Sequence, residues 1–169
     1  GTITSGAISA TGTISATAFV GDGSGLTNLP SSGGLQSITE GSTGYRRADA
    51  NAANHGNIGK GAVDLSFSND GSTSFGATGE NSIAMGVKTT ANNEVTTAMG
   101  FETIASGPAS TAMGLMTIAS GEVSTAMGEN TTASGFYSTA MGSYTTASGF
   151  YSTAMGENTT ASGDYSTAM

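Results

Sequence analysis

Small and polar residues recur at a fixed interval over the second half of the chain. An alanine stands at every seventh position from Ala77 to Ala168, fourteen times in succession. From residue 82 onward a Ser or Thr precedes each alanine by two positions, and a Gly follows nearly every alanine by two. Side chains on a strand alternate between two faces, so this pattern predicts short β-strands that end in glycine turns. A heptad helix is excluded, because glycine in every heptad opposes helix formation.

The true period is two of these units. The residue after each alanine is Met in one half-repeat and mostly Ser in the other, as in Ser138–Gly142 and Thr145–Gly149. One repeat therefore contains 14 residues and two strands. The predicted fold class is all-β, a stack of coils in which each repeat makes one turn of a β-roll or solenoid.

The two faces of each predicted strand have different compositions. The Ser/Thr and Ala positions are nearly the same in both halves, and we expect them to fill a thin interior between two sheets. The flanking positions are Thr and Met in one half, and Thr or Ile and Ser in the other. A continuous methionine strip would not remain in water, and self-association about an axis is the simplest way to cover it. The candidate interface residues are Met85, Met99, Met113, Met127, Met141, Met155 and Met169.

The glycine two residues after each alanine marks the corner of the coil. Its column has one internal exception, Asn93. Asn is the non-glycine residue that best tolerates a positive φ, so we expect this column to require a left-handed backbone.

Two regions precede the array. Residues 1–30 contain isolated isoleucines among Thr, Ser and Ala and are expected to form a thin strand-rich stalk; the segment 19–30 resembles a short motif of phage tail-fibre and bacterial surface proteins. Residues 31–76 are expected to be a linker and a cap for the first coil. They hold Arg46, Arg47, Lys60 and the single histidine, His55, so a ligand site over residues 46–60 stays open as an alternative to the cap. Residues 77–169 are the repeats, which we expect to continue beyond the chain end.

Composition excludes several classes of function. Four basic residues against twelve acidic ones give a net charge of −8, which would repel nucleic acid and anionic lipid. No apolar run is long enough to insert into a membrane, and the absence of cysteine excludes disulfides and thiolate metal sites. His55 has no motif around it and the repeats carry no Asp at a fixed phase, so we expect no enzyme activity, no cofactor and no metal.

The repeat resembles a known family. Ser124–Gly128 and Thr131–Gly135 are similar to the head repeat of YadA-type trimeric autotransporter adhesins, which reads Ser-Val-Ala-Ile-Gly in one half-turn and Ser-x-Ala-x-Gly in the other. The resemblance implies a left-handed parallel β-roll, a homotrimer and an adhesive, extracellular role. Thr in place of Val and Met in place of Ile would make the trimer axis softer and more polar. Phage tail-fibre-like proteins contain the same repeat, so a bacterial cell surface and a virion both remain open.

Recognition residues are expected at the corners. From Gly79 onward every charge and every aromatic residue falls in the two positions after the corner slot, and we expect the strands to carry none. A constant scaffold with variable corners is suited to binding a cell-surface glycan or protein receptor. A self-assembling filament without a receptor is the alternative, and an ice-binding solenoid a further one, because residues 132–134, 146–148 and 160–162 repeat Thr-Ala-Ser. The candidate ligand contacts are Phe136, Tyr137, Tyr144, Phe150, Tyr151 and Tyr165.

Overall fold

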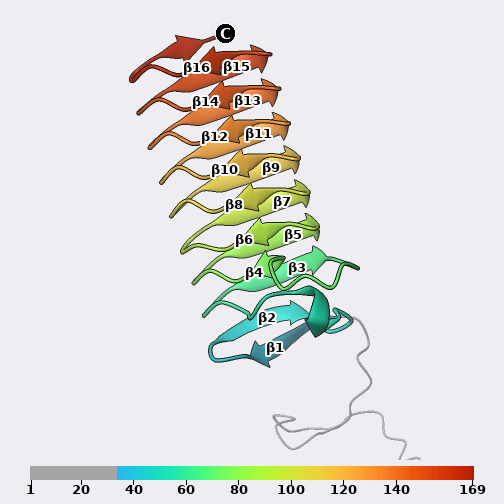
Figure 1. Ribbon diagram of the computed structural model, residues 1–169. Helices are drawn as coiled ribbons and strands as arrows, with labels where there is room; N and C mark the ends of the chain where they lie inside the picture. The colour runs from blue at the N-terminus through green and yellow to red at the C-terminus, as the bar shows by residue number, and fades with distance from the viewer. Residues whose placement is uncertain (1–33) are drawn as a thin grey trace, which may run out of the picture. The chain divides into compact units, whose positions relative to one another are not determined.

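Each 14-residue repeat forms one coil with a long and a short strand. The computed structural model describes residues 34–169, and Figure 1 shows their coils stacked one on another. The long strands are β3 (Val63–Phe67), β5 (Ile83–Val87), β7 (Thr97–Phe101), β9 (Thr111–Leu115), β11 (Thr125–Glu129), β13 (Thr139–Ser143), β15 (Thr153–Glu157) and the shortened β17 (Thr167–Ala168). The short strands are β4 (Gly76–Ala77), β6 (Thr90–Ala91), β8 (Ile104–Ala105), β10 (Ile118–Ala119), β12 (Thr132–Ala133), β14 (Thr146–Ala147) and β16 (Thr160–Ala161).

The strands of successive coils pair in parallel and in register. Met127 lies opposite Met141 in the long-strand sheet, and Thr132 lies opposite Thr146 in the short-strand sheet. The first sheet has ten strands in the order β1-β2-β3-β5-β7-β9-β11-β13-β15-β17, and the second has seven. The predicted all-β parallel solenoid with a 14-residue period is therefore confirmed.

The stack extends past the regular repeats at its base. β1 (Leu35–Thr39) and β2 (Thr43–Arg47) form an antiparallel hairpin, and β2 pairs in parallel with β3. The chain between β2 and β3 includes one 3₁₀ turn, η1 (Ala52–Asn54). Within residues 34–169 no helix has the length and hydrophobicity to span a membrane. The stalk expected over residues 1–30 lies outside the described residues.

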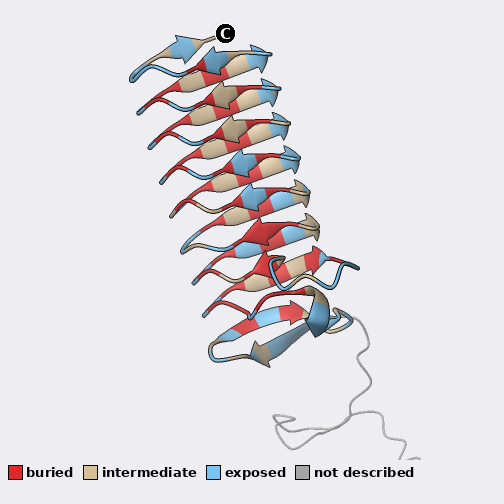
Figure 2. Cartoon of the chain, viewed as in Figure 1, coloured by how far each residue is buried: buried red, intermediate tan, exposed pale blue. Residues whose placement is uncertain are grey.

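The core consists of columns of small side chains. Ala84 and each seventh alanine up to Ala154 are completely buried, and so are the Ser or Thr residues two positions before them. Figure 2 shows these positions as buried bands along the strands, with exposed turns at their ends. Some interior hydroxyls donate to main-chain carbonyls: Ser152 Oγ to Gly149 O at 2.7 Å, and Ser110 Oγ to Ala119 O at 3.1 Å. The predicted thin interior is confirmed, and only side chains of this size fit it.

The corner glycines are required by the close approach of successive coils. A Cβ added at Gly107 would collide with the carbonyl oxygen of Gly121, one coil further on, and a Cβ at Gly128 would collide with that of Gly142. The half-repeats differ in backbone conformation. Gly86, Gly100, Gly114, Gly128, Gly142 and Gly156, which follow the methionines, have φ between 108° and 129°. The glycines of the other half do not have a positive φ.

The prediction that Asn93 marks a left-handed position is wrong. Asn93 stands in the half-repeat without positive φ, and it is not a positive-φ residue itself. Its side chain makes two hydrogen bonds to the backbone: Nδ2 donates to Ser106 O at 3.0 Å, and Oδ1 accepts from Glu94 N at 2.9 Å. The column is therefore glycine-rich mainly because the backbones approach closely.

The left-handed residue lies two positions after the corner slot. Thirteen non-glycine residues there have φ between 50° and 56°, among them Val95, Val123 and Tyr151. A β-branched residue at positive φ is strained by about 1–3 kcal/mol, so the stack must impose the conformation. It does so through the amide, since Val95 N donates to Glu80 O at 2.8 Å and Val123 N to Pro108 O at 2.8 Å. Residue type gives almost no signal for this position, although Asn occupies it three times, at residues 81, 130 and 158.

Substitution of Gly128 by Val should destabilise the stack. The new side chain would meet Gly142 O and would hold a β-branched residue at a φ of 123°, which costs on the order of 1–3 kcal/mol for the backbone alone. Thermal denaturation should show a lower Tm. The control is Asn93→Gly, which restores the residue used in the other coils and should be nearly neutral. Equal Tm values for Gly128→Val and the parent would refute the role of close approach.

Candidate functional site

Five of the six aromatic candidates lie together on one edge of the solenoid. Each coil has one turn after its long strand and one after its short strand. Tyr144 follows the long strand β13 and therefore lies at the edge opposite the other five. The remaining residues follow the short strands β12, β14 and β16 on consecutive coils. We call this group the aromatic ledge: Phe136, Tyr137, Phe150, Tyr151 and Tyr165.

The tyrosines of the ledge form a stacked column. The ring centroids of Tyr137 and Tyr151 are 4.7 Å apart at an interplanar angle of 4°, and those of Tyr151 and Tyr165 are 5.5 Å apart at 7°. The column follows from the coil repeat, because residues 14 apart lie one above the other at about the 4.8 Å spacing of neighbouring strands. All three tyrosines have the positive φ that is found at this turn position in the other coils.

The phenylalanines brace the column from the side. Phe150 packs edge-on against Tyr151 at 4.5 Å, and against Tyr137 at 6.2 Å. The turn is held in place by Asp164, whose Oδ1 accepts a hydrogen bond from Phe150 N at 3.0 Å. The rings cover one another's faces, so the ledge offers ring edges and phenol hydroxyls to a ligand. Its side chains remain partly exposed, from 38% at Phe150 to 74% at Tyr165.

The methionines form one column on the outer face of the long-strand sheet. Met85 pairs in register with Met99, and the pairing continues without a break to Met155. The column extends toward the base through Leu65, which lies opposite Met85 and which the repeat pattern did not reveal. Met85 and Met99 are each 37% exposed in the single chain.

A second apolar column accompanies the methionines near the base. Val87, Phe101 and Leu115 end the long strands two residues after the methionines and pair in register with one another, beyond the corner glycine. The same column continues with Glu129, Ser143 and Glu157. The expectation that strands carry no charged or aromatic residue is thus wrong, because the long strand runs one residue past the corner glycine. Apolar residues beside the methionine column are therefore concentrated near the base.

Charged side chains are buried at the base of the stack. Asp64 projects inward from β3 at a position equivalent to Ala84, and neither it nor Arg46 is exposed by more than 2%. Arg46 Nε donates to Asp64 Oδ2 at 3.2 Å, and its Nη1 lies 3.3 Å from Glu40 Oε1. His55 Nδ1 is 3.1 Å from Asp64 Oδ2. These contacts tie the hairpin, the loop after η1 and the first long strand together.

His55, Asp64 and Ser66 are the residue types of a hydrolytic triad without its geometry. In a triad the nucleophile and the carboxylate contact opposite nitrogens of the histidine. Here Ser66 Oγ and Asp64 Oδ2 both approach Nδ1, at 3.4 Å and 3.1 Å. Ser66 Oγ donates to Asp64 Oδ1 at 2.5 Å, so the serine hydroxyl proton points at the carboxylate and not at the imidazole. The sequence singled out His55 alone; polar residues at the inward positions of β3 were the signal for its two partners.

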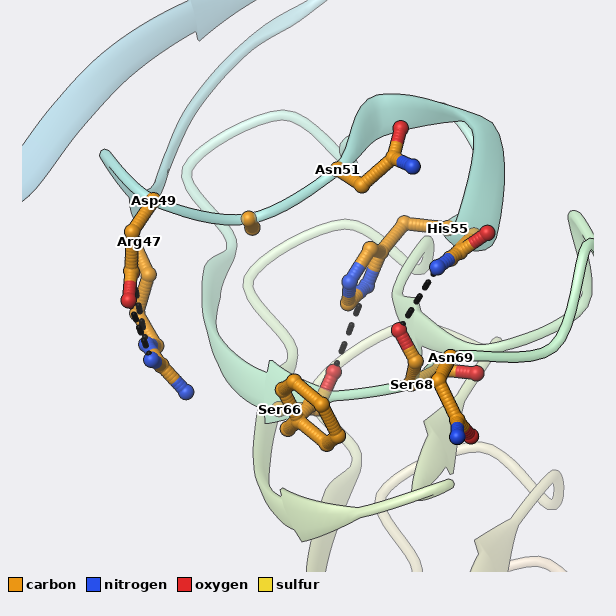
Figure 3. Close-up of a pocket in the computed structure, with 10 residues that line it drawn as sticks. Arg47, Asp49, Asn51, His55, Ser66, Ser68 and Asn69 are labelled. Atoms are coloured by element: carbon orange, nitrogen blue, oxygen red, sulfur yellow. Dashed lines mark hydrogen bonds and ion pairs between the residues drawn. The ribbon is translucent and has the colours of Figure 1, made fainter.

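A small pocket opens beside this cluster. It has a volume of about 140 Å³ and lies between the segment from Arg47 to His55 and the end of β3. Figure 3 shows the labelled side chains around it: Arg47, Asp49, Asn51, His55, Ser66, Ser68 and Asn69. Arg47 pairs with Asp49 through two hydrogen bonds, of 3.0 Å and 2.6 Å. No cluster of His, Asp and Glu within residues 34–169 is arranged to hold a metal ion.

The Thr/Ser face of the short-strand sheet is interrupted. Ile104 and Ile118 are each 37% exposed on it and, with Phe75 and Met116, line an apolar groove of about 350 Å³. Lys88 borders the groove and is paired with Asp70 at 2.7 Å. The regular hydroxyl array is therefore limited to the coils after this groove.

The fold and these sites define a repetitive β-solenoid whose variable residues are displayed on a constant frame. The family model of the YadA head domain repeat matches the chain at residues 77–103, 96–117, 105–128, 119–145 and 147–169, which together exceed half of the sequence. The chain belongs to the YadA head domain repeat family. No curated protein matches the sequence.

Membership of this family defines the broad function. YadA heads are adhesive, non-enzymatic parts of trimeric adhesins on bacterial cell surfaces. The expectation that the chain is not an enzyme is confirmed by the family.

Acid should weaken the base of the stack through Asp64. Burial alone would raise the pKa of this carboxyl, but hydrogen bonds from His55 and from Ser66 outweigh it and hold the pKa below its usual value. A carboxyl with a lowered pKa contributes stability above about pH 4, and this stability is lost as the pH falls through the folded-state pKa. Thermal denaturation between pH 6 and pH 2 should therefore show a falling Tm below about pH 4.

The matched variant is Asp64→Asn. It leaves Arg46 without its buried carboxylate, so it should be less stable at neutral pH by roughly 3–5 kcal/mol. Its Tm should also change less with acid than that of the parent. Parallel acid profiles for the two proteins would mean that Asp64 does not carry the effect.

Proposed function

We propose that this chain is a homotrimeric adhesive head whose long-strand sheets meet around a common axis. The observation that carries the proposal is the in-register methionine column on one face of one sheet. A rotation about an axis parallel to the stack keeps every coil at the same height, so each methionine meets its own copies. Three chains and a left-handed turn of the coil are part of the proposal, supported by the resemblance to the YadA head repeat.

The width of the apolar face supports the same arrangement. Val63, Leu65 and Ile83 extend it at the base. Burial of these side chains between protomers stabilises by about 25 cal/mol per Å² of apolar surface. Association is therefore expected to be strongest near the base, where the β1–β2 hairpin extends the long-strand sheet.

Receptor contact is assigned to the corners, with the aromatic ledge as the main surface. Three symmetry-related ledges on one fibre would bind a glycan or protein receptor with added avidity. Aromatic contacts also stabilise a sheet without any ligand, so bracing of neighbouring coils is the competing role. The head would act outside the cell, on a bacterial surface or, as in phage fibres with this repeat, on a virion.

Two other functions remain as alternatives. A self-assembling filament would use the same trimer without a receptor, and the ledge would then be structural. Ice binding would need a long flat hydroxyl array, whereas Ile104 and Ile118 interrupt it here. Thermal hysteresis of the purified protein would identify the second alternative.

Replacement of Met127 by Asp should disrupt the trimer. Three carboxylates would meet at an apolar axis, at a cost on the order of several kcal/mol unless they bind protons. Light scattering should report dissociation of the trimer, and calorimetry should report a lower Tm. The matched control is Ser134→Asp, which places the same charge on the exposed face of the other sheet and should leave a trimer intact. A Met127→Asp protein that remains trimeric with an unchanged Tm contradicts the proposed axis.

Replacement of Tyr137 and Tyr151 by Asn, the residue found at the same left-handed position at 81, 130 and 158, separates the two roles of the ledge. If the rings contact a receptor, binding to host cells or glycan arrays is lost while the Tm stays nearly constant. If the rings only brace the coils, the Tm falls and adhesion is unchanged. Tyr144→Asn, at the opposite edge, is the control and should affect neither binding nor the column.

A further inference from the structure

The pocket beside His55 has a neutral lining. Arg47 and Asp49 neutralise each other through their two hydrogen bonds, and this contact lowers the pKa of the Asp49 carboxyl. The carboxylate of Asp64 lies behind the wall, where Arg46 pairs with it. The other polar groups at the surface of the pocket are carboxamides, hydroxyls and one imidazole. Neither an anion nor a cation would find an unpaired opposite charge there.

Several polar atoms of the lining have no partner among the described residues. The His55 side chain is only 1% exposed and is held by Nδ1 at Asp64, yet its Nε2 makes no hydrogen bond within residues 34–169. Because Nδ1 faces a carboxylate, it carries the proton in the neutral ring, and Nε2 is then a bare acceptor. Asn51 uses its oxygen to cap η1 and keeps its NH₂ group, and the exposed Asn69 makes no side-chain hydrogen bond to the described residues. The pocket thus offers both donors and acceptors, as ligand hydroxyls require.

Phe67 adds an apolar wall to this polar lining. It ends β3, lines the pocket and is 50% exposed. A sugar ring presents C–H groups on one face and hydroxyls at its rim, so an aromatic side chain beside carboxamides is complementary to it. The volume of about 140 Å³ is far below the roughly 300–1,000 Å³ of pockets for larger ligands, which limits the occupant to one ring.

We propose that this pocket binds a single neutral pyranose ring, with Phe67 against the ring and with His55, Asn51 and Asn69 at its hydroxyls. The ring is either the terminal residue of a glycan or a free sugar. The pocket lies within one protomer, so the inference requires neither the trimer nor the aromatic ledge. It gives the adhesive head a second, sugar-specific contact at the opposite end of the stack from the ledge.

Saturation-transfer NMR on the whole protein tests this directly. The probes are the methyl α- and β-pyranosides of glucose, galactose, mannose and N-acetylglucosamine, each compared with its free reducing sugar. N-acetylneuraminic acid and glucosamine serve as charged comparisons. A neutral glycoside should bind more tightly than both charged sugars. Equal binding of a glycoside and its free sugar identifies a glycan end as a suitable ligand, and binding of the free sugar alone identifies a free monosaccharide.

Two variants locate the bound sugar. Asn69→Ala removes an exposed amide without a structural bond and should weaken binding roughly 3- to 10-fold. Phe67→Leu keeps an apolar side chain but removes the ring face, and should weaken binding by about tenfold. Tyr151→Thr in the ledge is the control and should leave affinity unchanged.

Three results would overturn the assignment. They are the absence of saturation transfer to every neutral sugar, affinities that are the same in the parent and in both pocket variants, and preferential binding of a charged sugar. Sedimentation of the same samples reports the oligomeric state independently. A monomer that still binds sugar contradicts the proposed trimer and leaves the pocket assignment intact.

Discussion

The close approach of successive coils is the constraint on which the rest of the structure depends. Strands of neighbouring coils pair in register along both sheets, which brings the corner backbones so near that a Cβ at Gly107 or Gly128 would strike the next carbonyl. Because the two sheets are also close together, the interior of the regular repeats is filled by Ala, Ser and Thr. Neither requirement depends on a large apolar core, which explains how a chain so poor in buried large side chains can be ordered.

The same stacking separates structure from recognition. The amide of each left-handed corner residue donates to the coil below, and the backbone therefore keeps its shape whether the side chain is Val95, Glu102 or Tyr151. Corner residues can change without changing the coil, and residues 14 apart automatically form columns. The stacked tyrosines are one result, and the apolar face around the methionines is another. The first places aromatic rings at an edge, and the second is the surface at which the protomers of the proposed trimer would meet.

The base of the stack differs from the repeats because it closes the end of the solenoid. A solenoid ends in unpaired strands and an open interior, and here an antiparallel hairpin and a buried ion cluster close it. Arg46, Asp64 and His55 could remain buried only because each is paired, since an unpaired charge would be far too costly. Ordering these polar groups also forms the wall of the small neutral pocket. The residues of this irregular region therefore close the end of the stack and also form a pocket, which the regular repeats do not form.

The sequence by itself determined the coil. Its period, the inward and outward positions, the tyrosine column and the methionine face all follow from side chains repeated at 7 and 14 residues, because each repeated position meets the same surroundings in every coil. The tertiary structure alone decided the left-handed residue two positions after the corner slot, the extra strand residue at Phe101 and Glu129, and the partners of His55. That left-handed position carries almost no residue signal because its conformation is imposed by hydrogen bonds between coils. The base occurs once, so no repetition reveals it, and its contacts join residues such as Arg46 and Asp64 that only folding brings together.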